Sequence, residues 1–180
     1  MTIESKRLTT LDCLENFPNL ESLNLIDNEI IEIKGLDALK KLKKLNLNRN
    51  KIINMKGLKN LKQLRELYLW NNQIKKISSL ENLTKLERLS LGGNQIREIT
   101  GLDSLKKLVF LDLSYNQLTK LEGLIDLQNL QVLYLHNNKL TEINEIFNIP
   151  KLREVKLENN SLSEVLKENL RSLNGFIKPL

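Results

Sequence analysis

The chain has 180 residues, of which 41% are hydrophobic and 28% are charged, a size and composition typical of one globular domain. Only 4% are aromatic, so we expect an aliphatic core. The formal net charge of +6 requires nucleic acid and acidic membrane surfaces to be considered as partners, whereas the single cysteine, Cys13, excludes a disulfide within the chain.

Targeting and membrane signals are not evident in the sequence. Residues 1–7 contain no apolar core of the kind found in signal peptides, and no apolar run approaches the length of a membrane span. We therefore expect a cytoplasmic protein without a membrane-bound state.

Residues 1–19 are the first predicted element, a degenerate coil of the repeat that follows. Met1 and Ile3 stand 22 residues before Leu23 and Leu25. The next apolar residues keep the same offset, with Leu8, Leu11, Leu14, Phe17 and Leu20 standing 22 residues before Ile30, Ile33, Leu36, Leu39 and Leu42. We expect this segment to be an eighth coil and not a separate domain.

Residues 20–161 repeat with a period of 22 and contain no insertion. Seven apolar columns recur at this period, and 47 of their 49 positions are apolar. They begin at Leu20, Leu23, Leu25, Ile30, Ile33, Leu36 and Leu39. The two exceptions, Glu168 and Arg171, both lie in the last unit, so chance does not explain the pattern.

The spacing within one repeat predicts its local structure. Leu23 and Leu25 alternate with period two, which indicates a short strand that points its leucines inward. The later apolar positions follow every three residues, a spacing typical of 3₁₀ or extended turns. Because one coil cannot bury its own leucines, the coils must stack, and their strands then form one parallel sheet.

An asparagine column follows the strands, at Asn28, Asn50, Asn72, Asn94, Asn116, Asn138 and Asn160. Backbone groups point inward where the chain leaves the strand, and a side-chain amide carries both the donors and the acceptor to satisfy them. We expect a structural ladder and no catalytic role for these residues.

Residues 162–180 change period. Leu162, Val165, Leu166, Leu170 and Leu173 fit an α-helical spacing. The sequence from Ser161 to Glu164 offers a capping box, and Asn174-Gly175 supplies a stop. We expect a capping helix that closes the end of the core, followed by a short tail.

The segment from Leu86 to Leu102 carries these motifs in their clearest form. It resembles leucine-rich repeats of the short 22-residue class, whose pattern is L-x-x-L-x-x-L-x-L-x-x-N-x-I-x-x-I-x-x-L. The class includes a regulatory subunit of protein phosphatase-1 and the bacterial internalins. The resemblance implies one α/β domain over residues 1–180: a right-handed solenoid with a concave parallel β-sheet, convex 3₁₀ or extended segments and a C-terminal capping helix. It also implies that the concave strand residues bind protein.

The open face of the predicted sheet holds five of the eight aromatic residues. Phe17, Phe147 and Phe176 are assigned to the core or the caps. Gly92 and Gly93 are expected to leave a depression beside the tryptophan. Exposed tryptophan and tyrosine are typical interface anchors. The predicted partner site consists of Glu66, Tyr68, Trp70, Arg88, Phe110, Asp112, Tyr115, Tyr134 and His136.

Other kinds of site are disfavoured. Charges on the open face are of both signs, whereas a phosphate-tracking surface should carry one sign, so we do not expect nucleic acid there. Ser114, His136 and Asp112 are near one another in register, but an open face offers neither a pocket nor an oxyanion hole. Cys13 stands in a column of small residues. We find no metal-ligand cluster, no phosphate loop and no cofactor motif.

The sequence therefore predicts a non-catalytic protein–protein interaction module, a regulatory or scaffold subunit that binds another protein on its concave face. We expect a monomer without a metal, a cofactor or a small-molecule substrate. The partner stays open, including whether it is a phosphatase. Two alternatives remain: a structural protein that self-associates through its end coils, and a nucleic-acid-binding module. Sedimentation at several concentrations and the salt dependence of binding separate them.

Overall fold

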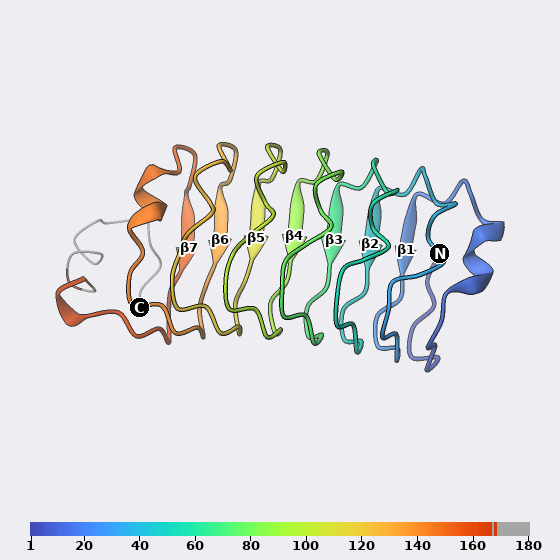
Figure 1. Ribbon diagram of the computed structural model, residues 1–180, viewed down its shortest axis with the longest axis horizontal. Coiled ribbons are helices and arrows are strands. Elements are labelled where there is room, and N and C mark those ends of the chain that lie inside the picture. Colours follow the sequence, from blue (N-terminus) through green and yellow to red (C-terminus); the bar gives the residue numbers. More distant parts are fainter. Residues whose placement is uncertain (167, 169–180) are drawn as a thin grey trace.

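The computed structural model describes residues 1–166 and 168 as a solenoid of stacked coils (Figure 1). Seven three-residue strands form one parallel sheet in the order β1 to β7. They are β1 Ser22–Asn24, β2 Lys44–Asn46, β3 Glu66–Tyr68, β4 Arg88–Ser90, β5 Phe110–Asp112, β6 Val132–Tyr134 and β7 Glu154–Lys156. A solenoid built on one parallel sheet is the fold that the sequence predicts.

The 22-residue period fixes the register of every strand pair. Leu23 lies opposite Leu45, and each later pair repeats this offset. Because equivalent residues lie side by side, each column of the repeat becomes a stripe that runs along the solenoid. Columns that point inward build the core, and columns that point outward become continuous surface features.

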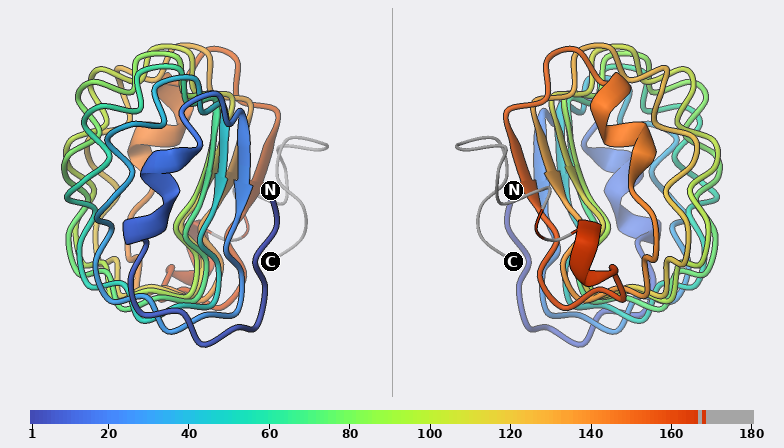
Figure 2. Two further views of the ribbon diagram at one scale, coloured as in Figure 1. Left: turned by 90° about the vertical axis from the view of Figure 1, so that its right-hand side faces the viewer. Right: turned by 90° about the vertical axis from the view of Figure 1, so that its left-hand side faces the viewer.

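Figure 2 shows the sheet on one side of the coil and the convex segments on the other. In the middle coils, the convex segments are successive tight turns in which an N–H donates to the carbonyl three residues earlier, such as Leu61 to Leu58 and Leu64 to Leu61. Regular 3₁₀ helices form near the two ends, as η1 Asp12–Asn16 and η2 Asn144–Asn148. The three-residue spacing of the apolar columns thus has its expected structural counterpart.

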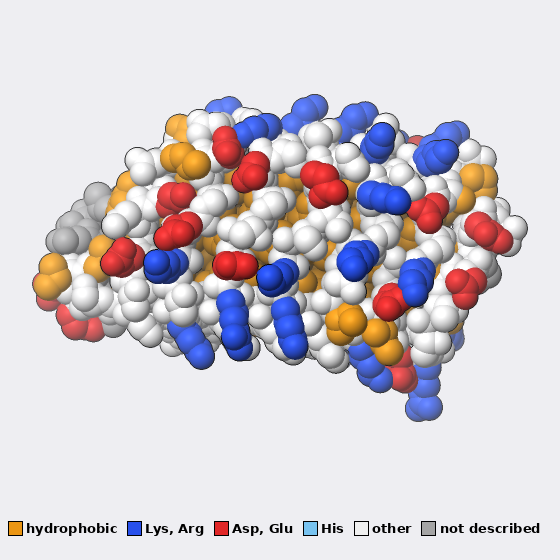
Figure 3. All heavy atoms as spheres, in the orientation of Figure 1, with side chains coloured by type: hydrophobic (Ala, Val, Ile, Leu, Met, Phe, Trp, Pro, Cys, Tyr) orange, Lys and Arg blue, Asp and Glu red, His pale blue; other side chains and the backbone are white. Residues whose placement is uncertain are grey.

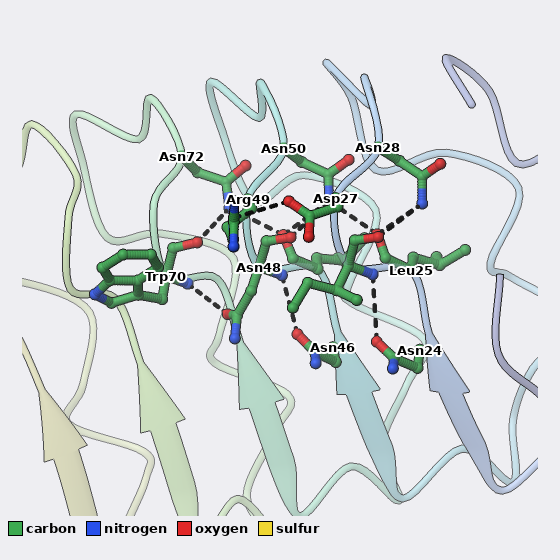
Figure 4. A network of polar contacts seen from close by, with 12 residues as sticks. Asn24, Leu25, Asp27, Asn28, Asn46, Asn48, Arg49, Asn50, Trp70 and Asn72 are labelled. Carbon is green, nitrogen blue, oxygen red and sulfur yellow. Dashed lines mark hydrogen bonds and ion pairs between the residues drawn. The ribbon is translucent and has the colours of Figure 1, made fainter. Parts of the chain in front are cut away.

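The asparagine ladder satisfies the backbone as predicted (Figure 4). Asn50 donates from Nδ2 to the carbonyl oxygens of Leu25 and Leu47, both at 3.0 Å, and its Oδ1 accepts the N–H of Ile30 at 3.1 Å. The same three bonds recur from Asn72 onwards. Each asparagine therefore joins its own coil to the preceding one by two hydrogen bonds.

The first coil packs against β1. Thr2 pairs with Asn24 as a parallel bridge, and the backbone N–H groups of Lys6 and Leu8 both donate to Oδ1 of Asn28. Residues 1–8 thus follow the path of the later coils. At the other end the helix begins at residue 164 and not at 162 as predicted, since Oγ of Ser163, and not a capping box from Ser161, accepts the N–H of Leu166 at 3.3 Å. Residues 164–166 and 168 are helical, and residues 167 and 169–180 of the predicted helix and tail lie outside the described residues.

Two phenylalanines assigned to the core or the caps are exposed in the structure. Phe17 ends η1 and is 44% exposed, because the first coil has no neighbour on its outer side. Phe147 in η2 is 52% exposed and stands in the column of Asp37, Glu81 and Asp103, which faces solvent. Phe17 thus lies in the end coil, one of the two places predicted for it, whereas the assignment was wrong for Phe147, and Phe176 lies outside the described residues.

Candidate functional site

The open face of the sheet carries a group of interacting side chains, which we call the aromatic face. It contains Lys44, Glu66, Tyr68, Trp70, Arg88, Phe110, Tyr115, Tyr134, His136, Glu154 and Lys156. All come from the strands β2 to β7 or from the two or three residues that follow a strand.

A charged chain connects β2 with β3. Nζ of Lys44 lies 2.9 Å from Oε2 of Glu66, and the hydroxyl of Tyr68 donates to the same oxygen at 2.8 Å. The bond from Lys44 lowers the pKa of Glu66 below its ordinary value and raises that of Lys44. Burial raises the pKa of Tyr68, and its bond to Glu66 acts in the same direction. The three groups therefore hold fixed charge states at neutral pH.

Trp70 is held from two sides. Its backbone N–H donates to Oδ1 of Asn48 at 2.7 Å (Figure 4), and its ring covers Gly92 on the next coil. A Cβ at Gly92 would lie only 2.8 Å from Cδ1 of Trp70, so the space expected as a depression is filled by the indole. The residue as a whole is still 37% exposed.

A second aromatic cluster lies on β5 and β6. Phe110 meets Tyr134 edge-to-face at 5.3 Å between ring centroids, an arrangement that aromatic pairs favour. The guanidinium of Arg88 lies 4.4 Å from the centroid of Phe110, and Nζ of Lys156 lies 4.1 Å from that of Tyr134. The two rings are thus sandwiched between cations.

Tyr115 and His136 extend this cluster past the ends of the strands. Their rings meet edge-to-face at 5.3 Å, and Tyr115 is 54% exposed at a backbone φ of 52°. Nδ1 of His136 and Oε2 of Glu158 are buried and have no hydrogen-bond partner within the described part of the chain. This end of the face therefore offers unsatisfied polar atoms next to an exposed tyrosine.

Asp112 forms part of the floor of the face, since only 9% of its surface is exposed. Its Oδ1 accepts the N–H and the hydroxyl of Ser114 at 3.0 and 2.6 Å, and its Oδ2 accepts the hydroxyl of Ser90 at 3.0 Å. Asn24 and Asn46, four and three coils earlier in the same column, likewise accept the N–H two residues on. Asp112 thus supports the turn after β5 and positions its neighbours.

The structure brings Glu66 together with Tyr68 and brings Arg88 together with Phe110, Tyr134, His136 and Tyr115 through successive ring contacts, whereas Trp70 packs on Gly92. Sequence reasoning did not select Lys44, Glu154 and Lys156, although Tyr134 donates to Glu154 at 3.2 Å. Their register marked all three as open-face positions. All three stand in a coil next to one that carries an aromatic residue on the open face, and this feature of the sequence could have identified them.

The serine, histidine and aspartate of the open face do not assemble as a catalytic set. The hydroxyl of Ser114 donates to Asp112, is buried, and makes no hydrogen bond to His136 among the described residues. Within residues 1–166 and 168, no group of three or more histidine, cysteine or acidic side chains is arranged to hold a metal ion. No described helix combines the length and apolar character needed to cross a membrane.

A family model for leucine-rich repeats, built on two copies of the repeat, matches residues 18–60, 62–104, 85–127, 106–148 and 128–172. The chain belongs to the leucine-rich-repeat family. Leucine-rich repeats of this internalin-like kind are typically non-enzymatic modules for protein–protein interaction. No curated protein matches the sequence.

Solved leucine-rich-repeat structures share the fold. An internalin (inlF) from Listeria monocytogenes superposes with a TM-score of 0.88 at 29% identity, over 97% of this chain and 52% of its own. Internalin C2 from the same organism superposes with a TM-score of 0.87 at 29% identity, over 99% of this chain and 79% of its own. The functional domain of InlJ from Listeria monocytogenes superposes with a TM-score of 0.68 at 24% identity, over 90% of this chain and 39% of its own. At this identity the similarity supports a shared fold and nothing more. The chain thus spans about half of the inlF internalin.

Proposed function

We propose that the protein is a non-catalytic binding module whose aromatic face holds a partner protein. The observation that carries the proposal is the position of five of the eight aromatic residues on the open side of the sheet. Trp70 and Tyr115 keep large exposed areas there, although the core did not require either residue. Tryptophan, tyrosine and arginine are the residues that most often dominate binding energy at interfaces.

The charges around the rings support a protein partner of mixed polarity. Lys44 and Glu66 neutralise each other, whereas Arg88 and Lys156 lie over rings and keep their charge. A partner segment that carries apolar or aromatic side chains with a few carboxylates would complement this arrangement. A regulatory or scaffold role for a monomeric protein follows as part of the same proposal.

The test is affinity capture of a partner by the wild type and by two double variants. Trp70→Ala/Tyr134→Ala removes two anchors, whereas Phe17→Ala/Phe147→Ala removes two exposed rings that lie away from the face. The proposal is supported if the phenylalanine control binds the partner as the wild type does and Trp70→Ala/Tyr134→Ala binds it at least about 30-fold more weakly. Each anchor is expected to contribute about 1–2 kcal/mol or more. Unchanged capture by Trp70→Ala/Tyr134→Ala contradicts it.

Self-association through the end coils is the competing function. Sedimentation velocity over a hundredfold range of concentration separates the two, because a monomer throughout rules out assembly of the chain with itself. Unfolding curves of both double variants complete the test, since loss of capture counts only in a variant that remains folded.

A further inference from the structure

The loops that lead into the strands carry the excess positive charge of the chain. One core leucine, such as Leu42, stands just before each strand. In each loop we consider the two residues before this leucine and the one residue after it, such as Lys40, Lys41 and Lys43. The six loops that precede β2 to β7 give eighteen such positions, which we call the basic edge. Its charged residues are Glu87 and ten cations: Lys40, Lys41, Lys43, Lys62, Arg65, Lys85, Lys106, Lys107, Lys151 and Arg153.

The basic edge has a net charge of +9, which exceeds the +6 of the whole chain, so the remainder of the chain is net acidic. Lysine and arginine side chains line the upper edge of the molecule in Figure 3. Nine of the ten cations are exposed, and Lys85 is partly exposed. With strands about 4.8 Å apart, the six loops extend over about 24 Å.

Three of the cations are neutralised by a carboxylate. Lys43 pairs with Glu21 at 2.7 Å, and two further pairs at 2.6 Å join Arg65 to Glu87 and Lys106 to Asp126. The other seven form no ion pair among the described residues.

Neutral amides on the preceding coil hold three of those seven. The ammonium group of Lys41 donates to Oδ1 of Asn19 at 2.8 Å. Lys85 donates to Gln63 at 2.6 Å, and Lys151 donates to Asn129 at 2.7 Å. An amide oxygen orients an ammonium group and leaves its charge intact. Lys107 lies in the same column, so four of its six positions carry a lysine, and amides orient three of these four.

We propose that the basic edge binds the phosphodiester backbone of a nucleic-acid duplex without reading its sequence. A length of about 24 Å corresponds to about seven base-pair steps of a duplex at 3.4 Å of axial rise each, and the edge contacts those phosphates that face it. The eighteen positions include no aromatic residue, so the edge offers no stacking platform for unpaired bases and favours a double strand.

The charges beside the edge favour a narrow partner over a flat one. A mainly acidic row lies three positions before the edge, with Asp37, Lys59, Glu81 and Asp103 in one column, and Asp126 in the next column pairs with Lys106. A bilayer laid against this side would approach both rows, whereas a rod can contact the basic row alone. The surface is also distinct from the aromatic face, so a protein partner and a duplex do not compete for the same residues.

The test measures fluorescence anisotropy of a labelled 20-base-pair duplex of arbitrary sequence between 50 and 200 mM NaCl. If about four ammonium groups neutralise phosphates, the logarithm of the binding constant falls with the logarithm of salt concentration with a slope of about −3.6, or about 150-fold over this range. Lys41→Gln/Lys85→Gln/Lys107→Gln should reduce that slope by about 2.7 and weaken binding more than tenfold at 50 mM NaCl.

The matched control is Lys56→Gln/Lys75→Gln/Lys139→Gln, which removes three exposed charges from other columns. This variant should keep the slope of the wild type, and circular dichroism should show both triple variants to be folded. Equal weakening by the two variants would overturn the proposal, because it would show that only the net charge matters. Absence of duplex binding at 50 mM NaCl overturns it too. This holds even if vesicles of phosphatidylserine bind through the same lysines.

Discussion

Replacement of Asn94 by alanine is expected to lower the free energy of unfolding by about 3 kcal/mol. Nδ2 of Asn94 donates to the carbonyl oxygens of Leu69 and Leu91 at 3.0 and 2.9 Å, and Oδ1 accepts the N–H of Ile74 at 2.9 Å. Both carbonyls keep a second donor from a neighbouring ladder asparagine. The N–H of Ile74 would keep no partner. One orphaned buried N–H costs about 1–3 kcal/mol, and each lost bond to a satisfied carbonyl costs about 0.5–1 kcal/mol.

Asn160, the last member of the ladder, is the matched control for this prediction. It makes the same three bonds, to Leu140, Leu135 and Leu157, but it is only partly buried, so water can replace the amide. We expect Asn160→Ala to lose about 1 kcal/mol. Urea unfolding measures both losses, and amide hydrogen exchange at Ile74 should accelerate in Asn94→Ala. Equal losses for the two variants, or a loss below about 1 kcal/mol for Asn94→Ala, would refute the reasoning.

Three further changes test the aromatic face itself. Gly92→Ala should push the indole of Trp70 away, with a loss of about 1–3 kcal/mol and red-shifted tryptophan emission; an unshifted spectrum would contradict the packing. Asp112→Ala should lose about 2 kcal/mol and Asp112→Asn at most half of that, since the amide retains an acceptor; equal losses would argue against this role. Because its pKa is lowered by Lys44, Glu66 stabilises the fold above the ordinary glutamate pKa and loses this contribution as the pH falls through its folded-state value. With a third of the side chain exposed, the effect stays below about 1 kcal/mol, and Glu66→Gln should show a smaller loss of stability between pH 7 and 3. An unaltered pH dependence would assign the effect to other groups.

The fold followed from the sequence because the 22-residue period determines both partners of every contact in the core. Leu23 and Leu45 must lie opposite each other once neighbouring coils stack without an insertion, and the register of all seven strands then repeats. The inward turn after each strand likewise required an amide, which is why the hydrogen bonds of Asn50 could be anticipated.

The contacts between side chains in the site were less predictable. The register of the strands determines the face to which a side chain points, but not which neighbouring side chains are large enough to contact it. Asp112 points to the open face as predicted, yet Ser90 and Ser114 are small enough to close over it with hydrogen bonds. Gly92 was expected to leave a space, but the ring from the preceding coil occupies it. Both outcomes depend on contacts between columns, which a column-by-column comparison of the sequence does not contain.

The repeat also explains how one small solenoid can carry two different surfaces. The core uses seven apolar columns and the ladder uses one, which leaves the remaining columns free to vary without changing the register. A substitution in a free column alters one stripe of the surface and leaves the stacking intact, because its side chain points to solvent. Aromatic residues collected beside Trp70 and cations collected beside Lys41 occupy different free columns, at the open face and at the strand-entry loops. The stacking of the coils therefore does not require aromatic residues on the open face or cations in the strand-entry loops. The excess of each needs an explanation other than the packing of the core.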